Sequence, residues 1–179
     1  MSKKDHTSEA ERISNLLLSA ETEQVRKGID ECQNAHSAAI ILPLLTLLKD
    51  PAMREFHAEV RALLNATKAD GAINFFMQAF RSPAYHEVQA DIVSALWSAP
   101  VATGNAFNEI IMAALNGDFR LQMETITLIE ENTSDITEEQ ILEAYETITR
   151  RLNDSSEKNP MIMDMHRAIS LLRAQSEAE

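Results

Sequence analysis

The chain contains few of the residues that build turns or end helices. Its 179 residues include only 4 Gly and 5 Pro. An all-β fold needs many turns, so this scarcity argues against one and favours helices. Aromatic residues make up 5% of the chain, too few for the stacking surfaces that bind single-stranded nucleic acid. Hydrophobic residues, at 45%, are abundant enough to fill a core.

Positive charge is also scarce. The chain has 16 Lys and Arg against 28 Asp and Glu, a formal net charge of −12. A surface of this sign repels phosphate backbones and anionic lipids. We therefore predict no nucleic-acid partner and no membrane partner.

Cysteine is almost absent. Cys32 is the one cysteine, so no disulfide can form within the chain, which is typical of proteins in a reducing cytoplasm. No apolar run approaches the roughly 20 residues of a transmembrane helix, and the residues after Met1 show no signal-peptide pattern. These features predict a cytoplasmic protein.

Apolar residues recur at helical spacing along most of the chain. The clearest stretch, 42–64, reads LPLLTLLKDPAMREFHAEVRALL: one apolar helix, a turn at Asp50-Pro51, and a second apolar helix. Similar helix pairs are predicted at about 8–34, 37–64, 71–97, 104–131 and 137–174, with polar ends at 1–7 and 176–179. The capping-box spacing of Ser8 and Glu11 places the first helix start at Ser8.

The second helices of these pairs repeat one pattern. Their first apolar residues are spaced 31, 32, 33 and 44 residues apart. Offsets of 0, 4 and 7 lie on one helix face, so each column predicts one layer of a continuous core. The columns are Val25, Phe56, Val88, Leu121 and Met165; Ile29, Val60, Ile92, Thr125 and Ile169; and Cys32, Leu63, Ala95, Leu128 and Leu172.

Helix caps recur in the same register. Strong N-cap residues stand six positions before four of the five anchors: Ser19, Asp50, Ser82 and Asn159. Three of them are followed by Pro, which favours the first position of a helix. The fourth pair has Leu115 there, and Asn116 or Asp118 is predicted to cap instead.

The segments LLKDPAMREF and AEVRALL resemble the HEAT repeat. Pro43 stands where that family often has a kinking proline, and Val25-Arg26 resembles its Val-Arg pair. The resemblance implies an all-α, right-handed solenoid of about five antiparallel helix pairs, whose second helices line a concave surface that holds proteins or peptides. The family's recurrent basic residue after the anchor appears once, as Arg26.

HEAT-like enzymes offer an alternative. Deoxyhypusine hydroxylases, which are HEAT-like, bind two irons through several His-Glu pairs, whereas this chain has one such pair, His86-Glu87. We interpret it as surface and predict no catalytic residue, no metal site and no cofactor. A metal-dependent hydroxylase, a bilin-lyase-like enzyme and, less favoured by the charge, a DNA glycosylase remain the alternatives. Cys32 is predicted to be a buried hydrophobic residue.

Acidic residues gather at the −1, +3 and +6 positions from each anchor, beside the core stripe. Glu55, Glu59, Glu87, Asp91 and Glu124 are predicted to form an acidic ridge on the concave face that binds a basic segment of a protein or peptide. The alternative is ordinary surface charge. Without counter-charges such a ridge repels itself, so changing Glu59 and Asp91 to Lys is expected to leave stability equal or higher.

The +2 and +5 positions of the middle helices are mostly apolar, with Arg61 the exception, and predict helices buried on two sides. Three methionines at 161, 163 and 165 are interpreted as core, with self-association as the alternative. The sequence as a whole predicts a non-catalytic scaffold or adaptor module.

Overall fold

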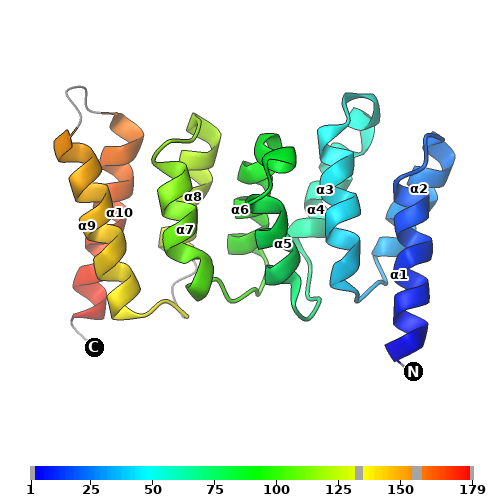
Figure 1. The fold of residues 1–179 in the computed structure, drawn as a ribbon, viewed down its shortest axis with the longest axis horizontal. Coiled ribbons are helices and arrows are strands. Elements are labelled where there is room, and N and C mark those ends of the chain that lie inside the picture. The colour runs from blue at the N-terminus through cyan, green and yellow to red at the C-terminus, as the bar shows by residue number, and fades with distance from the viewer. Residues whose placement is uncertain (1–2, 132–134, 155–158, 178–179) are drawn as a thin grey trace. The chain divides into compact units, whose positions relative to one another are not determined.

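The chain folds into helices. A computed structural model describes residues 3–131, 135–154 and 159–177. The structure is 80% helical, with ten α-helices and, over those ranges, no strand (Figure 1). The prediction of an all-α fold with about ten helices is confirmed. Among the described residues, no helix combines the length and the apolar character needed to cross a membrane.

Two compact units divide the chain, Met1–Val101 and Ala102–Glu179. The first contains α1 (Lys3–Leu17), α2 (Thr22–Cys32), η1 (Ala38–Ile40), α3 (Ile41–Lys49), η2 (Pro51–Phe56), α4 (His57–Asn65), α5 (Ala72–Phe80), η3 (Pro83–Val88) and α6 (Gln89–Ser98). The second contains η4 (Gly104–Ala106), α7 (Phe107–Ala114), α8 (Phe119–Glu131), α9 (Glu138–Asp154) and α10 (Pro160–Ser176). Elements labelled η are 3₁₀-helices.

Within each unit, consecutive helices pack as pairs. In the first unit α1 pairs with α2, α3 with α4, and α5 with α6. Contacts between pairs join equivalent helices, since α3 contacts α1 and α5 while α4 contacts α2 and α6. In the second unit α7 pairs with α8 and α9 with α10, and α7 contacts α9 while α8 contacts α10.

The predicted core columns are almost entirely buried. Fourteen of the fifteen side chains at offsets 0, 4 and 7 are buried, and Thr125, the polar member, donates its hydroxyl to the Leu121 carbonyl at 2.8 Å. Leu63 is the exception, because it is only half-buried while its neighbour Leu64 is 1% exposed.

Two second helices open as 3₁₀-helices, which the sequence analysis did not predict. Both openings begin with Pro and contain one residue outside helical geometry, Met53 (φ −98°, ψ 17°) in η2 and Tyr85 (φ −117°, ψ 15°) in η3. Pro provides no N–H and fixes its own φ. The regular helix starts only after the 3₁₀ turn, at His57 and at Gln89, whereas Pro160 opens α10 directly, so proline alone does not explain the 3₁₀ openings.

Three side chains cap helices where the repeat predicted caps. Asp50, Asp118 and Asn159 each accept a hydrogen bond from a backbone N–H two or three residues later, at 2.8–2.9 Å. The prediction for Ser19 was wrong, because Ser19 accepts from the N–H of Glu21, and Glu21 is the N-cap of α2, where no side chain makes a capping hydrogen bond. Asp118 thus replaces the missing cap residue at Leu115, as one of the two alternatives predicted.

Two further capping predictions differ from the structure. Ser82 occupies the N-cap position of η3, but its side chain makes no capping hydrogen bond. The prediction for Ser8 was wrong, because α1 begins at Lys3 and Ser8 lies inside it. Residues 3–7, predicted as part of a polar end, also belong to this helix. A capping-box spacing marks a helix start only where the chain before it is not helical.

The position after each anchor has a structural role in three pairs. His57, Gln89 and Gln122 each place a side-chain nitrogen 2.8–3.2 Å from a carbonyl oxygen near the end of the preceding helix, α3, α5 and α7 respectively. Helix ends leave carbonyl groups without partners. These side chains supply donors there and fasten the two helices of a pair together.

Candidate functional site

The predicted acidic ridge is divided between the two units. Glu55 lies in η2, Glu59 in α4, Glu87 in η3 and Asp91 in α6, all in the first unit, whereas Glu124 lies in α8 of the second. Glu55, Glu59 and Glu87 are exposed, Glu124 is half-buried, and Asp91 is only 3% exposed. Asp91 is therefore not part of an open surface.

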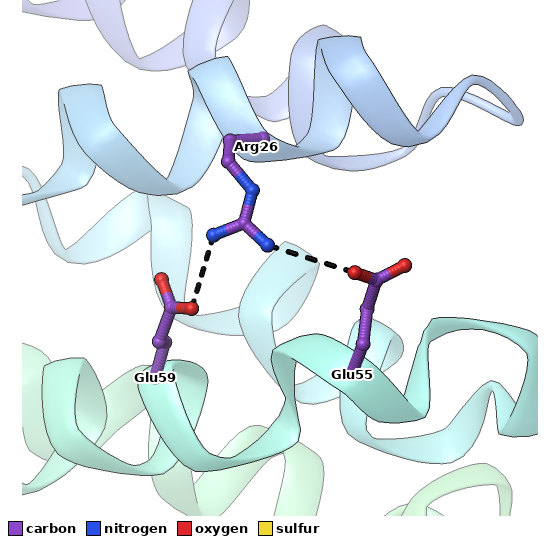
Figure 2. A network of polar contacts seen from close by, with 3 residues as sticks. All are labelled: Arg26, Glu55 and Glu59. Atoms are coloured by element: carbon purple, nitrogen blue, oxygen red, sulfur yellow. Dashed lines mark hydrogen bonds and ion pairs between the residues drawn. The ribbon is translucent and has the colours of Figure 1, made fainter.

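Glu55 and Glu59 do lie together, around a cation. Figure 2 shows the Arg26 guanidinium of α2 between the two carboxylates. Arg26 Nη1 lies 3.1 Å from Glu59 Oε1, and Arg26 Nη2 lies 3.6 Å from Glu55 Oε2. The same guanidinium stacks over the Phe56 ring, 4.6 Å from its centroid. One arginine thus compensates both carboxylates.

Asp91 has its own cation. Arg61 of α4 donates from Nε to Asp91 Oδ1 at 2.6 Å. Arg26 and Arg61 both belong to the second helix that precedes the acid in the chain, so the −1 and +3 positions face that neighbour. The prediction of a ridge without counter-charges was wrong for Glu55, Glu59 and Asp91. Arg61, the exception among apolar +5 positions, was the signal that could have revealed the pairing.

A different feature stands out in the second unit. Four large apolar side chains are exposed on α8 and α10: Phe119 (64%), Met123 (47%), Met163 (42%) and Leu171 (60%). They occupy offsets −2, +2 and +6 from the anchors Leu121 and Met165. At about 100° per residue the −2 and +2 offsets lie roughly opposite the core stripe, and the +6 offset of Leu171 lies in the same strip as the −1 and +3 positions.

These four residues define the α8/α10 apolar surface. α8 and α10 contact each other. Phe119 and Met123 lie about one helical turn apart on α8, whereas Met163 of α10 also lines a pocket with Tyr145, Thr149 and Leu152 of α9. The −2 and +2 positions of the middle second helices in the first unit are polar or small: Arg54 in η2 and Ala58 in α4, His86 in η3 and Ala90 in α6. Contiguous exposed apolar side chains mark interaction sites on many proteins.

This surface was not predicted, because the apolar +2 and +5 positions of the middle second helices were expected to be buried. That prediction holds for Ala90 and Val93 of α6, which are buried, and is wrong for Ala58 and Met123, which are exposed. A period of four between Phe119 and Met123, off the core stripe, was the available signal.

Charge accompanies the apolar surface. The second unit carries 15 Asp and Glu against 6 Lys and Arg, a net charge of −9, whereas the first carries 13 against 10, a net charge of −3. The second unit therefore has most of the excess negative charge of the chain. A ligand for its apolar surface would meet a negative field.

The candidates for metal or nucleophilic chemistry lie apart from this surface. His86 and Glu87 are exposed in η3. Over residues 3–131, 135–154 and 159–177, no three His, Cys, Asp or Glu side chains are placed to hold a metal ion. Cys32 is buried, and burial, with a smaller contribution from the charge of Glu31, raises its pKa to about 12. Its thiol is neutral at physiological pH, and its predicted burial is confirmed.

Comparisons of the chain with protein-family models, with curated proteins and with solved structures find no match. A function can therefore be proposed only from the side chains and contacts of this chain.

Proposed function

We propose that this chain is a HEAT-like repeat protein that binds a segment of another protein and catalyses no reaction. The observation that carries the proposal is the α8/α10 apolar surface. Burying a large apolar side chain that is otherwise exposed is worth about 1.5–3 kcal/mol. Four such side chains, two on each of two helices in contact, provide binding energy of the kind that marks interaction sites on many proteins.

The proposed architecture is one right-handed solenoid of five helix pairs. Its support is the repeated core register in both units and the contacts of equivalent helices within each unit. In repeat proteins each unit contacts its neighbours in this way. In such a solenoid the face of the second helices opposite the core is the concave surface, and α8 and α10 contribute its apolar part.

The proposed occupant is an amphipathic helix with an apolar stripe and basic flanks. Amphipathic helices bind through apolar anchors spaced three to four residues apart, which suits the spacing of Phe119 and Met123. The net charge of −9 on this unit attracts a cationic segment and raises its association rate. It disfavours a second copy of the chain, because face-to-face docking would bring two like-charged units together.

A binding assay with a defined probe tests this proposal. The probe is a fluorescent amphipathic peptide of about 18 residues, or five helical turns, with Leu on one face and Lys on the other. We expect fluorescence anisotropy to show saturable binding that weakens as salt is added, because screening shortens the reach of the charges. Met123→Asp should weaken binding at least tenfold.

The control variant is Leu142→Asp, which changes an exposed apolar residue of α9 outside the surface. It should bind the peptide as the wild type does. Equal affinity of the Met123→Asp variant, or equal binding of a Leu–Glu peptide, would refute the proposed surface or the proposed charge preference respectively. Sedimentation showing a dimer that Met123→Asp dissociates would identify a second copy as the occupant and refute the proposal of a foreign segment.

A further inference from the structure

A cavity of about 280 Å³ lies in the first unit, far in sequence from the α8/α10 apolar surface. It is formed where the segment after α2, the start of α3 and the end of α4 come together. Its volume is near the lower end of the roughly 300–1,000 Å³ of drug-sized ligand sites. The cavity therefore suits a small molecule of modest length.

The inner wall of the cavity is apolar. Ile40, Ile41, Leu44 and Leu64 line it, and Leu63, the one predicted core residue that is not fully buried, also faces it. Cys32 completes this wall, and its raised pKa keeps the thiol neutral. A wall of this composition favours a hydrocarbon chain.

The rim of the cavity is polar and basic. Lys68 and His36 are exposed lining residues, accompanied by Gln33 and Thr67, and the lining contains no carboxylate among the described residues. Acids outnumber basic residues in the chain as a whole, 28 to 16. Glu31, next to Cys32, is not a lining residue, and its Oε2 atom lies 2.5 Å from Nη1 of Arg12. The rim thus offers an anion the ammonium group of Lys68 and the imidazole of His36.

We infer that this cavity binds a small amphipathic monoanion: a carboxylate with an unbranched chain of about eight carbons. The chain lies against the apolar wall, and the carboxylate meets the ammonium group of Lys68, a mobile point charge with three donors. His36 adds a second donor at the rim. This site is separate from the proposed peptide-binding surface and does not depend on it.

Titration with three probes of equal chain length tests the inference. Octanoate, octanol and octylamine are compared by calorimetry and by the methyl NMR signals of the full chain. We expect octanoate to bind tightest, with shifts concentrated at Ile40, Ile41 and Leu44. Octanol should bind at least tenfold more weakly, and octylamine should not bind.

Two charge variants separate a local head-group contact from the general field. Lys68→Glu should weaken octanoate at least tenfold, whereas Lys27→Glu, the same charge change on an exposed residue of α2 outside the cavity, should not. Leu63→Phe, which fills the cavity with an apolar side chain, should abolish binding while the chain stays folded by circular dichroism. Absence of octanoate binding, equal binding of octanol, or equal losses in the two lysine variants would overturn the inference.

Discussion

The two units differ in the side chains that their second helices carry outside the core stripe. In the first unit, Arg26 and Arg61 reach from one second helix to acids of the next, and the positions opposite the core are polar or small. In the second unit, the positions opposite the core include Phe119 and Met123, exposed at 64% and 47%. The same helical register thus supports an ion-paired seam in one unit and an apolar surface in the other.

This difference separates internal charge from available surface. Most of the predicted acidic residues in the first unit are already compensated, so they contribute to contacts between helices. The net charge of −9 and the apolar side chains of the second unit make that unit the better candidate for binding. Acidic composition alone does not identify a binding site, because an acid that has a neighbouring arginine attracts a partner less strongly.

The largest effect is expected at Asp91, the buried acid of the Arg61–Asp91 ion pair. Asp91→Lys places a second cation beside Arg61 at a position that is 3% exposed. We expect a loss of about 3 kcal/mol in the free energy of unfolding, measured with urea, since the new Lys would place an uncompensated charge at a buried position. The Arg61 side chain itself is 42% exposed. This expected loss is opposite to the equal or higher stability that the sequence analysis expects for Glu59 and Asp91 changed together to Lys. Glu87→Lys, on an exposed acid of the same predicted ridge, is the control and should change stability by less than about 0.5 kcal/mol.

In the second unit, the next prediction concerns a glycine, Gly104, whose backbone lies close to that of Asp135. Gly104 donates its N–H to Asp135 Oδ2 at 2.6 Å and accepts from Gln140 Nε2 at 2.5 Å. A Cβ at Gly104 would overlap the Asp135 carbonyl oxygen. We expect Gly104→Ala to cost about 2 kcal/mol, because the backbone must shift.

The control for this change is Gly117→Ala, whose Cβ would meet chiefly the end of the Leu121 side chain. That side chain can move, so thermal unfolding should show a smaller loss, about 1 kcal/mol or less. Equal losses in the two variants would show that close approach at Gly104 is not the special feature of this unit.

The exposed Arg26–Glu59 ion pair should contribute less to stability than the Arg61–Asp91 pair. A double-mutant cycle with Arg26→Ala and Glu59→Ala should give a coupling energy of about 0.2–1 kcal/mol, since both groups are half-exposed and the pair is screened by solvent. The coupling should fall further in high salt. A coupling above about 2 kcal/mol would contradict the view that this pair is weak and would place it with the buried Arg61–Asp91 pair.

The smallest effect on stability is expected on the α8/α10 apolar surface. Met123→Ser and Leu171→Ser should change the free energy of unfolding by about 0.5 kcal/mol or less, because both side chains are exposed in the folded chain. Leu128→Ser, on the buried face of the same α8 helix, should cost several times more. A large loss in the first two variants would mean that these side chains support the fold and are not free for a partner.

Much of the fold follows from the sequence because its signals are local. Helix caps such as Asp118 and Asn159 bond to N–H groups two or three residues away, so nearby residues decide them. The core columns follow from the 3.6-residue period, since one helix face must be buried. The misplaced start at Ser8 and the 3₁₀ openings at Pro51 and Pro83 are local too, but they depend on small differences in backbone energy that pattern does not resolve.

The candidate site depended on the tertiary structure. The helical period predicts the angle between Asp91 and the core stripe of α6. It does not predict that the guanidinium of Arg61, from the preceding second helix, contacts the Asp91 carboxylate. The same holds for Met123, whose +2 offset equals that of Ala90, although the first is exposed and the second buried. Sequence by itself determined the helices, their buried faces and most of their caps. The tertiary structure decided which charges are paired and which apolar side chains face solvent, because both depend on the neighbour that occupies each side of a helix and on the reach of its side chains.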